Sequence, residues 1–124
     1  MSLATTAAAI NSRFVELYKA GDMKTLATEL YHEDCKLLLS GVEPLFGRKG
    51  VEEGLNALKK SGVAEIKIAS EEIDGFETDT AYDRGNCIFF NDDGIQLEVG
   101  KYLAIYKKVH GKYLMCIDIA NSNI

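Results

Sequence analysis

The chain has 124 residues, of which 47% are hydrophobic and 27% charged, with a single proline. This length and composition fit one ordered domain over residues 1–124 and exclude a disordered or linker-rich protein. The formal net charge of -5 and the pI near 5.0 leave no basic stripe, which argues against nucleic acid and anionic membranes as partners.

Cysteine usage and apolar runs indicate the compartment. Cys35, Cys87 and Cys116 stand singly inside apolar runs, without the close spacing of a disulfide framework or a zinc site. No apolar run approaches the ~20 residues that a membrane helix needs. The start, MSLATTAAAINSR, lacks the basic leader of a secretory signal. We therefore expect a cytoplasmic protein with reduced, buried thiols.

The first part of the chain has helical periodicity. A predicted helix over residues 6–20 carries its apolar side chains on one stripe and ends at Gly21. Asp22 is the expected N-cap of a short second helix. The stripe of the first helix consists of Ile10, Phe14, Leu17 and Tyr18.

A short strand, CKLLLS at residues 35–40, follows the helical hairpin. After a loop that contains the proline, a third helix is predicted to begin near Arg48 and to end around Ser61 and Gly62. Its buried side is expected to consist of Val51, Leu55 and Leu58.

The rest of the chain reads as four strands joined by tight turns. They cover residues 64–75, 78–90, 95–108 and 111–120. The turns at 91–94 and 109–111 each contain a glycine, as hairpins require. Helices followed by an antiparallel meander indicate an α+β fold.

Both faces of the longest predicted strand are apolar or aromatic. Leu103 and Ile105 alternate with Tyr102, Ala104 and Tyr106. The N-terminal helices can cover only one face of such a sheet. A second copy of the chain would most simply bury the other apolar face. We therefore expect a homodimer that forms through the sheet face.

In this order of elements the chain resembles the nuclear-transport-factor-two-like superfamily. The resemblance is carried by FVELYKAGDMKTLATELYHEDCKLLLSG, by GRKGV and by GKYLAIYKKVHGKYLMCIDIANSN. These segments look most like the small SnoaL-like and ketosteroid-isomerase-like proteins, including the group related to the calmodulin-dependent kinase association domain. The resemblance implies a cone-shaped α+β fold, with N-terminal helices packed in a curved, mostly antiparallel sheet. It also implies a ligand pocket inside the cone and dimerisation through the outer face. Because this scaffold hosts many activities, it predicts fold better than chemistry.

The resemblance provides a test for ketosteroid isomerase chemistry, which uses an aspartate base and an oxyanion hole of tyrosine and protonated aspartic acid. Alignment on the shared AGD places Phe14 at the tyrosine, Leu39 at the base and Leu103 at the second oxyanion donor. Phenylalanine cannot donate a hydrogen bond and leucine cannot move a proton. We therefore do not expect steroid isomerisation by that route.

Asp118 is the best catalytic candidate because it is a carboxylate within an apolar strand. Strand alternation groups it with Leu114, Cys116 and Ala120 on one face. If that face lines the cone, burial would raise the pKa of Asp118 and suit it to acid or base chemistry. The alternative is a structural carboxylate that is paired with a buried arginine or with backbone amides.

Arg84 is the expected partner of Asp118, and Asn121 is a further candidate at the end of the same strand. Arg84 alternates with Tyr82 and Asn86 on one strand face, and in a pocket it could clamp a carboxylate ligand. It could equally lie at a dimer surface or in solvent. Asn121 could orient a ligand or simply cap the chain end.

Tyrosines supply the remaining candidates for a pocket wall. Tyr18 and Tyr31 are placed on helices, and Tyr102 lies on a central strand. A phenol offers apolar area and one hydrogen bond, which suits a small and largely apolar ligand. These residues could instead be ordinary core or interface residues.

No metal or cofactor is predicted. The His32–Cys35 run contains metal-ligand residue types, but consecutive residues at a helix end do not converge on one ion. The segment Asn91–Gly94 is explained by a hairpin and lacks the ligand spacing of a calcium loop.

These observations favour a homodimeric protein that binds a small, largely apolar molecule inside the cone. Its ligand pocket is expected to include Phe14, Tyr18, Tyr31, Leu39, Arg84, Tyr102, Leu103, Asp118 and Asn121. One alternative is a protein–protein assembly module with a vestigial pocket. A weaker alternative is an acid/base isomerase or lyase that uses Asp118.

Overall fold

The computed structural model describes residues 3–123, so residues 1, 2 and 124 of the predicted domain lie outside the description. Its α+β architecture agrees with the sequence prediction. In chain order the elements are α1 (Leu3–Ala20), α2 (Met23–Leu30), β1 (Tyr31–Leu39), β2 (Leu45–Phe46), α3 (Gly47–Lys60), β3 (Glu65–Asp74), β4 (Thr80–Phe90), β5 (Gln96–Val109) and β6 (Lys112–Ser122).

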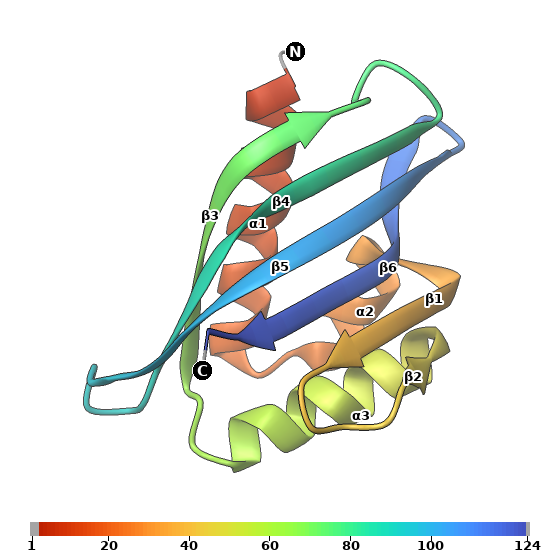
Figure 1. Cartoon of the computed structure of the whole chain (residues 1–124). Helices are drawn as coiled ribbons and strands as arrows, with labels where there is room; N and C mark the ends of the chain where they lie inside the picture. Colours follow the sequence, from red (N-terminus) through yellow and green to blue (C-terminus); the bar gives the residue numbers. More distant parts are fainter. Residues whose placement is uncertain (1–2, 124) are drawn as a thin grey trace.

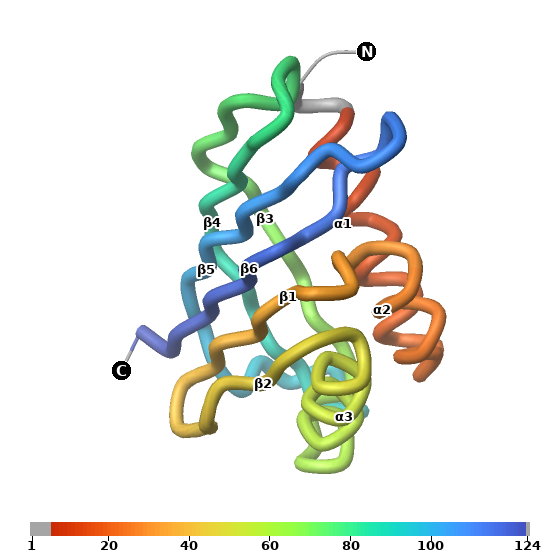
Figure 2. The backbone as a smooth tube through the Cα atoms, turned by 90° about the vertical axis from the view of Figure 1, so that its right-hand side faces the viewer, coloured from red at the N-terminus to blue at the C-terminus, as the bar shows by residue number. Residues whose placement is uncertain are grey.

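The strands form one six-stranded sheet in the order β2-β1-β6-β5-β4-β3. Only β1 and β6 pair in parallel, and the other neighbours are antiparallel. The sheet is strongly curved, and the three helices lie on its inner side, as Figure 1 and Figure 2 show. α3 crosses one end of the curved sheet (Figure 2), so the inner side is enclosed by α1, α2 and α3.

The helix boundaries follow from local capping. Gly21 has a φ of 78°, the left-handed conformation that ends α1 without a side-chain clash. The Asp22 carboxylate then accepts a hydrogen bond from the backbone N–H of Thr25 at 3.2 Å and caps α2. The predicted stripe of α1 faces the core, where Phe14, Leu17 and Tyr18 are buried.

The first strand begins earlier than the sequence analysis predicted. β1 starts at Tyr31 and not at Cys35, because Tyr31 already has extended backbone angles (φ -113°, ψ 144°) as the C-cap residue of α2. Tyr31 therefore lies on a strand and not on a helix. The two-residue strand β2 was not predicted, and it pairs with β1 through Lys36 and Leu37.

A β-bulge in β6 changes which of its side chains face inward. Ile105 of β5 is opposite Ile117, whereas the next residue, Tyr106, is opposite Met115, so Cys116 is the extra residue. Met115 and Asp118 consequently both face the inner side. Strand alternation from the sequence placed Asp118 correctly with Ala120, but it wrongly placed Cys116 and Leu114 on that face, since Leu114 is opposite Lys107 on the outer side. The Cys116 thiol instead donates to the Ile105 carbonyl at 3.2 Å.

Two further features concern the chain as a whole. No helix within residues 3–123 is long and apolar enough to span a membrane. All three cysteines are free thiols, with Cys35 and Cys87 buried and Cys116 half-buried.

Candidate functional site

A cavity of about 70 Å³ lies between the inner face of the sheet and the helices. Side chains from α1, α3 and all strands except β2 line it, and most of them are apolar. Among the described residues that line it, Asp118 is the only Asp or Glu, and none is Lys, Arg or His. The apolar wall includes Phe14, Leu37, Leu55, Ile66, Phe89 and Met115.

Sheet register places two carboxylates on the inner face with one small residue between them. Ala104 of β5 is opposite Asp83 of β4 on one side and opposite Asp118 of β6 on the other. Neighbouring strands are about 4.8 Å apart, so the two aspartate backbones are separated by about 10 Å. Because directly paired residues point to the same side of a sheet, both carboxyl groups face the interior.

Asp118 is held by one phenol and presents its other oxygen to the cavity. The Tyr31 hydroxyl donates to Oδ2 at 2.5 Å, and Tyr31 is fully buried. Oδ1 has no hydrogen-bond donor among the described residues. No buried side-chain oxygen of residues 3–123 lacks a partner, so Oδ1 is open to the cavity and not sealed in the core.

Burial raises the pKa of Asp118 from its ordinary 3.8 to about 6. Removal of the carboxylate from bulk water is the main cause. The hydrogen bond from Tyr31 opposes this shift, and the nearby Asp83 charge adds to it. The side chain therefore changes protonation state close to neutral pH, which is unusual for an aspartate.

Asp83 is fully buried and anchors a network of neutral donors. The Tyr102 hydroxyl lies 3.0 Å from both carboxylate oxygens, and the Asn11 side-chain amide donates to Oδ2 at 3.1 Å. Asn11 also donates to the Ser70 hydroxyl at 2.9 Å, and that hydroxyl lies 3.3 Å from the Tyr102 oxygen. The network fixes Asn11 and Tyr102 where they line the cavity.

The phenols and the thiol around the two aspartates stay protonated at neutral pH. Burial raises the pKa of Tyr31, Tyr102 and Tyr106, and the two carboxylates raise it further. Burial also raises the pKa of the Cys87 thiol to about 11, with smaller contributions from Asp118 and Glu98. Tyr31 and Tyr102 therefore act as hydrogen-bond donors and not as bases.

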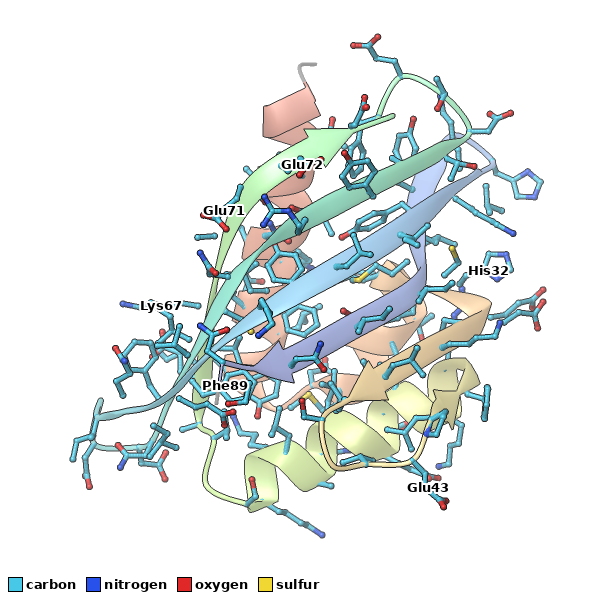
Figure 3. The ribbon with its side chains drawn as sticks, viewed as in Figure 1. His32, Glu43, Lys67, Glu71, Glu72 and Phe89 are labelled. Carbon is cyan, nitrogen blue, oxygen red and sulfur yellow. The ribbon has the colours of Figure 1, made fainter. Side chains whose placement is uncertain are left out.

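A second hollow of about 150 Å³ adjoins the cavity, and we refer to it as the mouth. The two spaces share Leu39, Leu58, Cys87, Phe89 and Ala120 as wall residues. In Figure 3 Phe89 lies at the end of the sheet where β6 terminates, which agrees with its place in both walls. Glu98, which is half-buried, and Asn121 line this mouth, and the Ser40 hydroxyl donates to the Asn121 side-chain oxygen at 3.2 Å.

The structure brings together several of the residues that the sequence analysis selected. Phe14, Leu39, Tyr102 and Asp118 line the cavity. Tyr31 lies behind Asp118 as its hydrogen-bond donor. These five residues come from α1, β1, β5 and β6, which are distant in the sequence and adjacent in the fold.

Arg84 was predicted as the partner of Asp118, and this prediction is wrong. Its guanidinium is on the outer face of the sheet, where it pairs with Glu72 at 3.1 Å and with Glu71 at 3.5 Å. All three side chains are about half exposed, and Figure 3 shows the two glutamates on β3. The neighbouring Asp83 faces inward, because successive strand residues alternate between faces.

Three other predicted pocket residues lie outside the cavity wall. Leu103 is on the outer face, since its neighbours Tyr102 and Ala104 face inward. Tyr18 is fully buried in the core, where its hydroxyl donates to the Val63 carbonyl at 2.7 Å. Asn121 is at the mouth only.

The sequence analysis did not select Asp83, Asn11 or Glu98. A signal for Asp83 was present, because it alternates with Ala81, Gly85 and Cys87, which are typical of a buried face. The polar residues Tyr82, Arg84 and Asn86 mark the opposite, solvent-facing side. For Asn11 and Glu98 the sequence holds no comparable signal.

The described residues contain no group of three or more His, Cys, Asp or Glu side chains that could hold a metal ion. His32 projects away from the sheet at the start of β1 (Figure 3). Its ring nitrogen Nδ1 accepts a hydrogen bond from the backbone N–H of Asp34 at 3.0 Å. This local contact accounts for the orientation of the ring.

Comparisons with known proteins give structural matches only. No protein-family model matches the chain, and no curated protein sequence matches it. An NTF2-like protein with a cystatin-like fold from Novosphingobium aromaticivorans aligns over 98% of this chain and 82% of its own, at 16% identity and a TM-score of 0.84.

Two further solved structures have the same fold. A candidate calcium/calmodulin-dependent protein kinase II association domain from Xanthomonas campestris has a TM-score of 0.83 and 20% identity, and the alignment covers 98% of this chain and 89% of that one. A ketosteroid isomerase-like protein from Erwinia carotovora atroseptica has a TM-score of 0.77 and 18% identity over 98% of this chain and 96% of its own. The chain therefore has the nuclear-transport-factor-two-like fold that its sequence resemblance predicted.

Proposed function

We propose that the protein binds a small, largely apolar molecule in the cavity and holds it by a hydrogen bond to Asp118. The observation that carries this proposal is the Oδ1 atom of Asp118, a strong acceptor that faces the cavity with no donor among the described residues. Buried polar groups are nearly always hydrogen-bonded in folded proteins, so an open acceptor in an apolar cavity is a natural position for a ligand.

The chemistry of the wall restricts the ligand further. The apolar side chains favour a hydrocarbon body, and Asp118 requires a hydrogen-bond donor. No cationic side chain lines the cavity among residues 3–123, so an anionic ligand would have no counter-charge there. Alcohols, amides and amines meet both requirements, whereas carboxylates and phosphates do not.

A thermal-shift screen of small hydrophobic alcohols, amides and amines tests this function. Because a ligand that binds only the folded state stabilises it by mass action, a concentration of 100 times Kd should add about 2.7 kcal/mol. Ala120→Leu fills the space beside Asp118 and should abolish the shift, while Leu103→Ala on the outer face should preserve it. If no compound shifts the unfolding temperature of the wild type at millimolar concentration, the proposal is wrong.

Acid/base catalysis at Asp118 is the second candidate, and the pKa of about 6 favours it. A carboxylate with this pKa can accept a proton at neutral pH and return it within one turnover, as isomerases and lyases require. The open Oδ1 atom of Asp118 can accept the transferred proton. The phenol of Tyr31 remains protonated, because its pKa is raised.

Proton exchange in D₂O tests the catalytic candidate without a known substrate. Small cyclic ketones would be incubated with the protein, and loss of their α-proton signals would be followed by NMR. The exchange rate should rise with pH around a midpoint near 6 and should vanish in Asp118→Asn. Equal exchange rates for the wild type and Asp118→Asn would contradict the candidate.

We also propose that the outer face of the sheet pairs two copies of the chain. An apolar patch supports this pairing, because Leu103 and Ile105 of β5 are opposite Ile119 and Ile117 of β6, and Leu38 of β1 is opposite Ile119. All five side chains are only partly buried in a single chain. A contiguous apolar patch of this kind is typical of an interface.

Light scattering distinguishes the dimer from a single chain of 13.6 kDa. We expect twice this mass at micromolar concentration, and the single-chain mass for Ile119→Lys. A wild type that remains monomeric would contradict the dimer. A dimer that binds no compound in the screen would instead favour the assembly-module alternative.

A further inference from the structure

Among the described residues that line the cavity and its mouth, two side chains are acidic and none is basic, and a third carboxylate lies directly behind the cavity wall. Asp118 lies on the cavity wall, Asp83 lies behind Tyr102 and Asn11, and Glu98 lies at the mouth. Glu98 is opposite Phe89, a wall residue, so its side chain is on the inner side of the sheet. The three carboxylates thus extend from the interior to the opening.

The side chains that donate hydrogen bonds to the two inner carboxylates are all neutral. Tyr31 donates to Asp118, and Tyr102 and Asn11 donate to Asp83. Neither aspartate has an ion-pair partner within residues 3–123, whereas Arg84 pairs only with the exposed glutamates of β3. Arg48 of α3 donates to the backbone carbonyl of Tyr31 at 2.9 Å. Its side chain does not line the cavity.

Uncompensated carboxylates in an apolar cavity make the electrostatic potential there negative, and the low local dielectric strengthens this effect. A cation gains from the potential and can also donate a hydrogen bond to Oδ1 of Asp118. A neutral donor gains only the hydrogen bond, which is weaker than a charge-assisted one. An anion is repelled by all three carboxylates.

We infer that the ligand is a small hydrophobic amine whose ammonium group binds Oδ1 of Asp118 while its hydrocarbon part contacts the apolar wall. The inference rests on the proposed binding function and adds the charge of the ligand. Glu98 attracts the cation to the mouth before it enters. The open Oδ1, the apolar wall and the carboxylates without ion-pair partners among residues 3–123 together select this class over alcohols and amides.

Three probes of equal size and different charge test the inference: benzylamine, benzyl alcohol and benzoate. Affinities for the whole protein would be measured by NMR titration at pH 7.5 and low salt. We expect benzylamine to bind at least about tenfold more tightly than benzyl alcohol, because an ammonium pairs with the carboxylate. Benzoate should show no binding.

Single substitutions test which carboxylates cause the preference for benzylamine. Asp118→Asn should remove the preference for benzylamine, so that it binds no more tightly than benzyl alcohol. Glu98→Gln should weaken benzylamine only a few-fold, and the effect should disappear at high salt. Glu43→Gln is the control, since Glu43 projects from the loop between β1 and β2 (Figure 3) and should leave every affinity unchanged.

The results separate this inference from the function on which it rests. If benzyl alcohol or benzoate binds as tightly as benzylamine, the ligand is not selected by positive charge and the inference is wrong, while the binding function stands. If benzylamine binds equally well to Asp118→Asn, its site is elsewhere and the inference is also wrong. If none of the three probes binds, both the inference and the proposed binding of small apolar molecules are contradicted.

Discussion

Asp83 and Arg84 are adjacent in β4 and occupy opposite environments. Asp83 is fully buried and is held by neutral donors, whereas Arg84 is half exposed and pairs with glutamates on the outer face. The same contrast separates Asp118 on the inner face from Glu72 on the outer face. Charged residues in this sheet thus have opposite roles according to the face on which they lie, and one step along a strand decides between them.

The largest effect on the unfolding free energy is expected from Asp83→Ala, which would be compared with Arg84→Ala by urea denaturation. Loss of the Asp83 carboxylate leaves the buried donors of Asn11 and Tyr102 without their acceptor, so we expect a loss of about 2–4 kcal/mol in unfolding free energy. Arg84→Ala removes only solvent-screened pairs and should cost far less. Equal losses for the two variants would contradict the difference between the faces.

The pH dependence of stability should have opposite signs on the two faces. Asp118 has a raised pKa of about 6 in the folded state, so between pH 4 and 6 the folded protein binds more protons than the unfolded chain. Its contribution to stability is therefore full below about pH 4 and is lost as the pH rises through 6. The loss is on the order of 2–3 kcal/mol.

Glu72 should behave in the reverse manner, because its bonds to Tyr82 and Arg84 hold its pKa below the ordinary value of 4.5. Its contribution is present above pH 4.5 and is lost as the pH falls. Urea denaturation from pH 2.5 to 7 would compare the wild type with Asp118→Asn and Glu72→Gln. An unchanged pH profile in Asp118→Asn would show that Asp118 does not titrate in this range.

The smallest effect is expected from removal of a single hydroxyl on each face. Tyr31→Phe should raise the pKa of Asp118 above about 6, since the Tyr31 bond is the contact that lowers it. The unfolding free energy at pH 7 should fall by about 1–2 kcal/mol. Tyr82→Phe should affect only the pKa of Glu72 on the outer face. NMR titration of the carboxyl carbons would measure both pKa values, and an unshifted Asp118 would contradict the assigned contact.

The sequence predicted the elements better than the orientation of their side chains. The apolar stripe of α1 and the capping residues Gly21 and Asp22 were sufficient for the helical hairpin, because helix periodicity and capping are local. Asp118 was found for a similar reason, as a single carboxylate in an apolar strand. Leu103 was assigned to the wrong face, because both faces of β5 are apolar and long-range pairing decides which of them lines the cavity. Arg84 was assigned to the wrong face although the alternation of residues in β4 already indicated that its side chain faces solvent.

The start of β1 and the partner of Asp118 depend on contacts that are remote in sequence. Tyr31 follows an amphipathic helix without a break in the pattern, and only its pairing opposite Met115 makes it the first residue of a strand. Its hydrogen bond to Asp118 joins residues 87 positions apart. Local pattern reasoning has no access to such a pair.

The bulge at Cys116 shifts by one residue the alternation of β6 side chains between the two faces of the sheet. In an uninterrupted ladder from Met115, each residue would change sides, and residue 118 would arrive opposite Leu103 on the outer face. The extra residue delays the alternation by one step, so the carboxylate arrives opposite Ala104 instead. A chain that lacked residue 116 would therefore keep Asp118 in the cavity, whereas one that kept all its residues but straightened the strand would turn the carboxylate out to solvent.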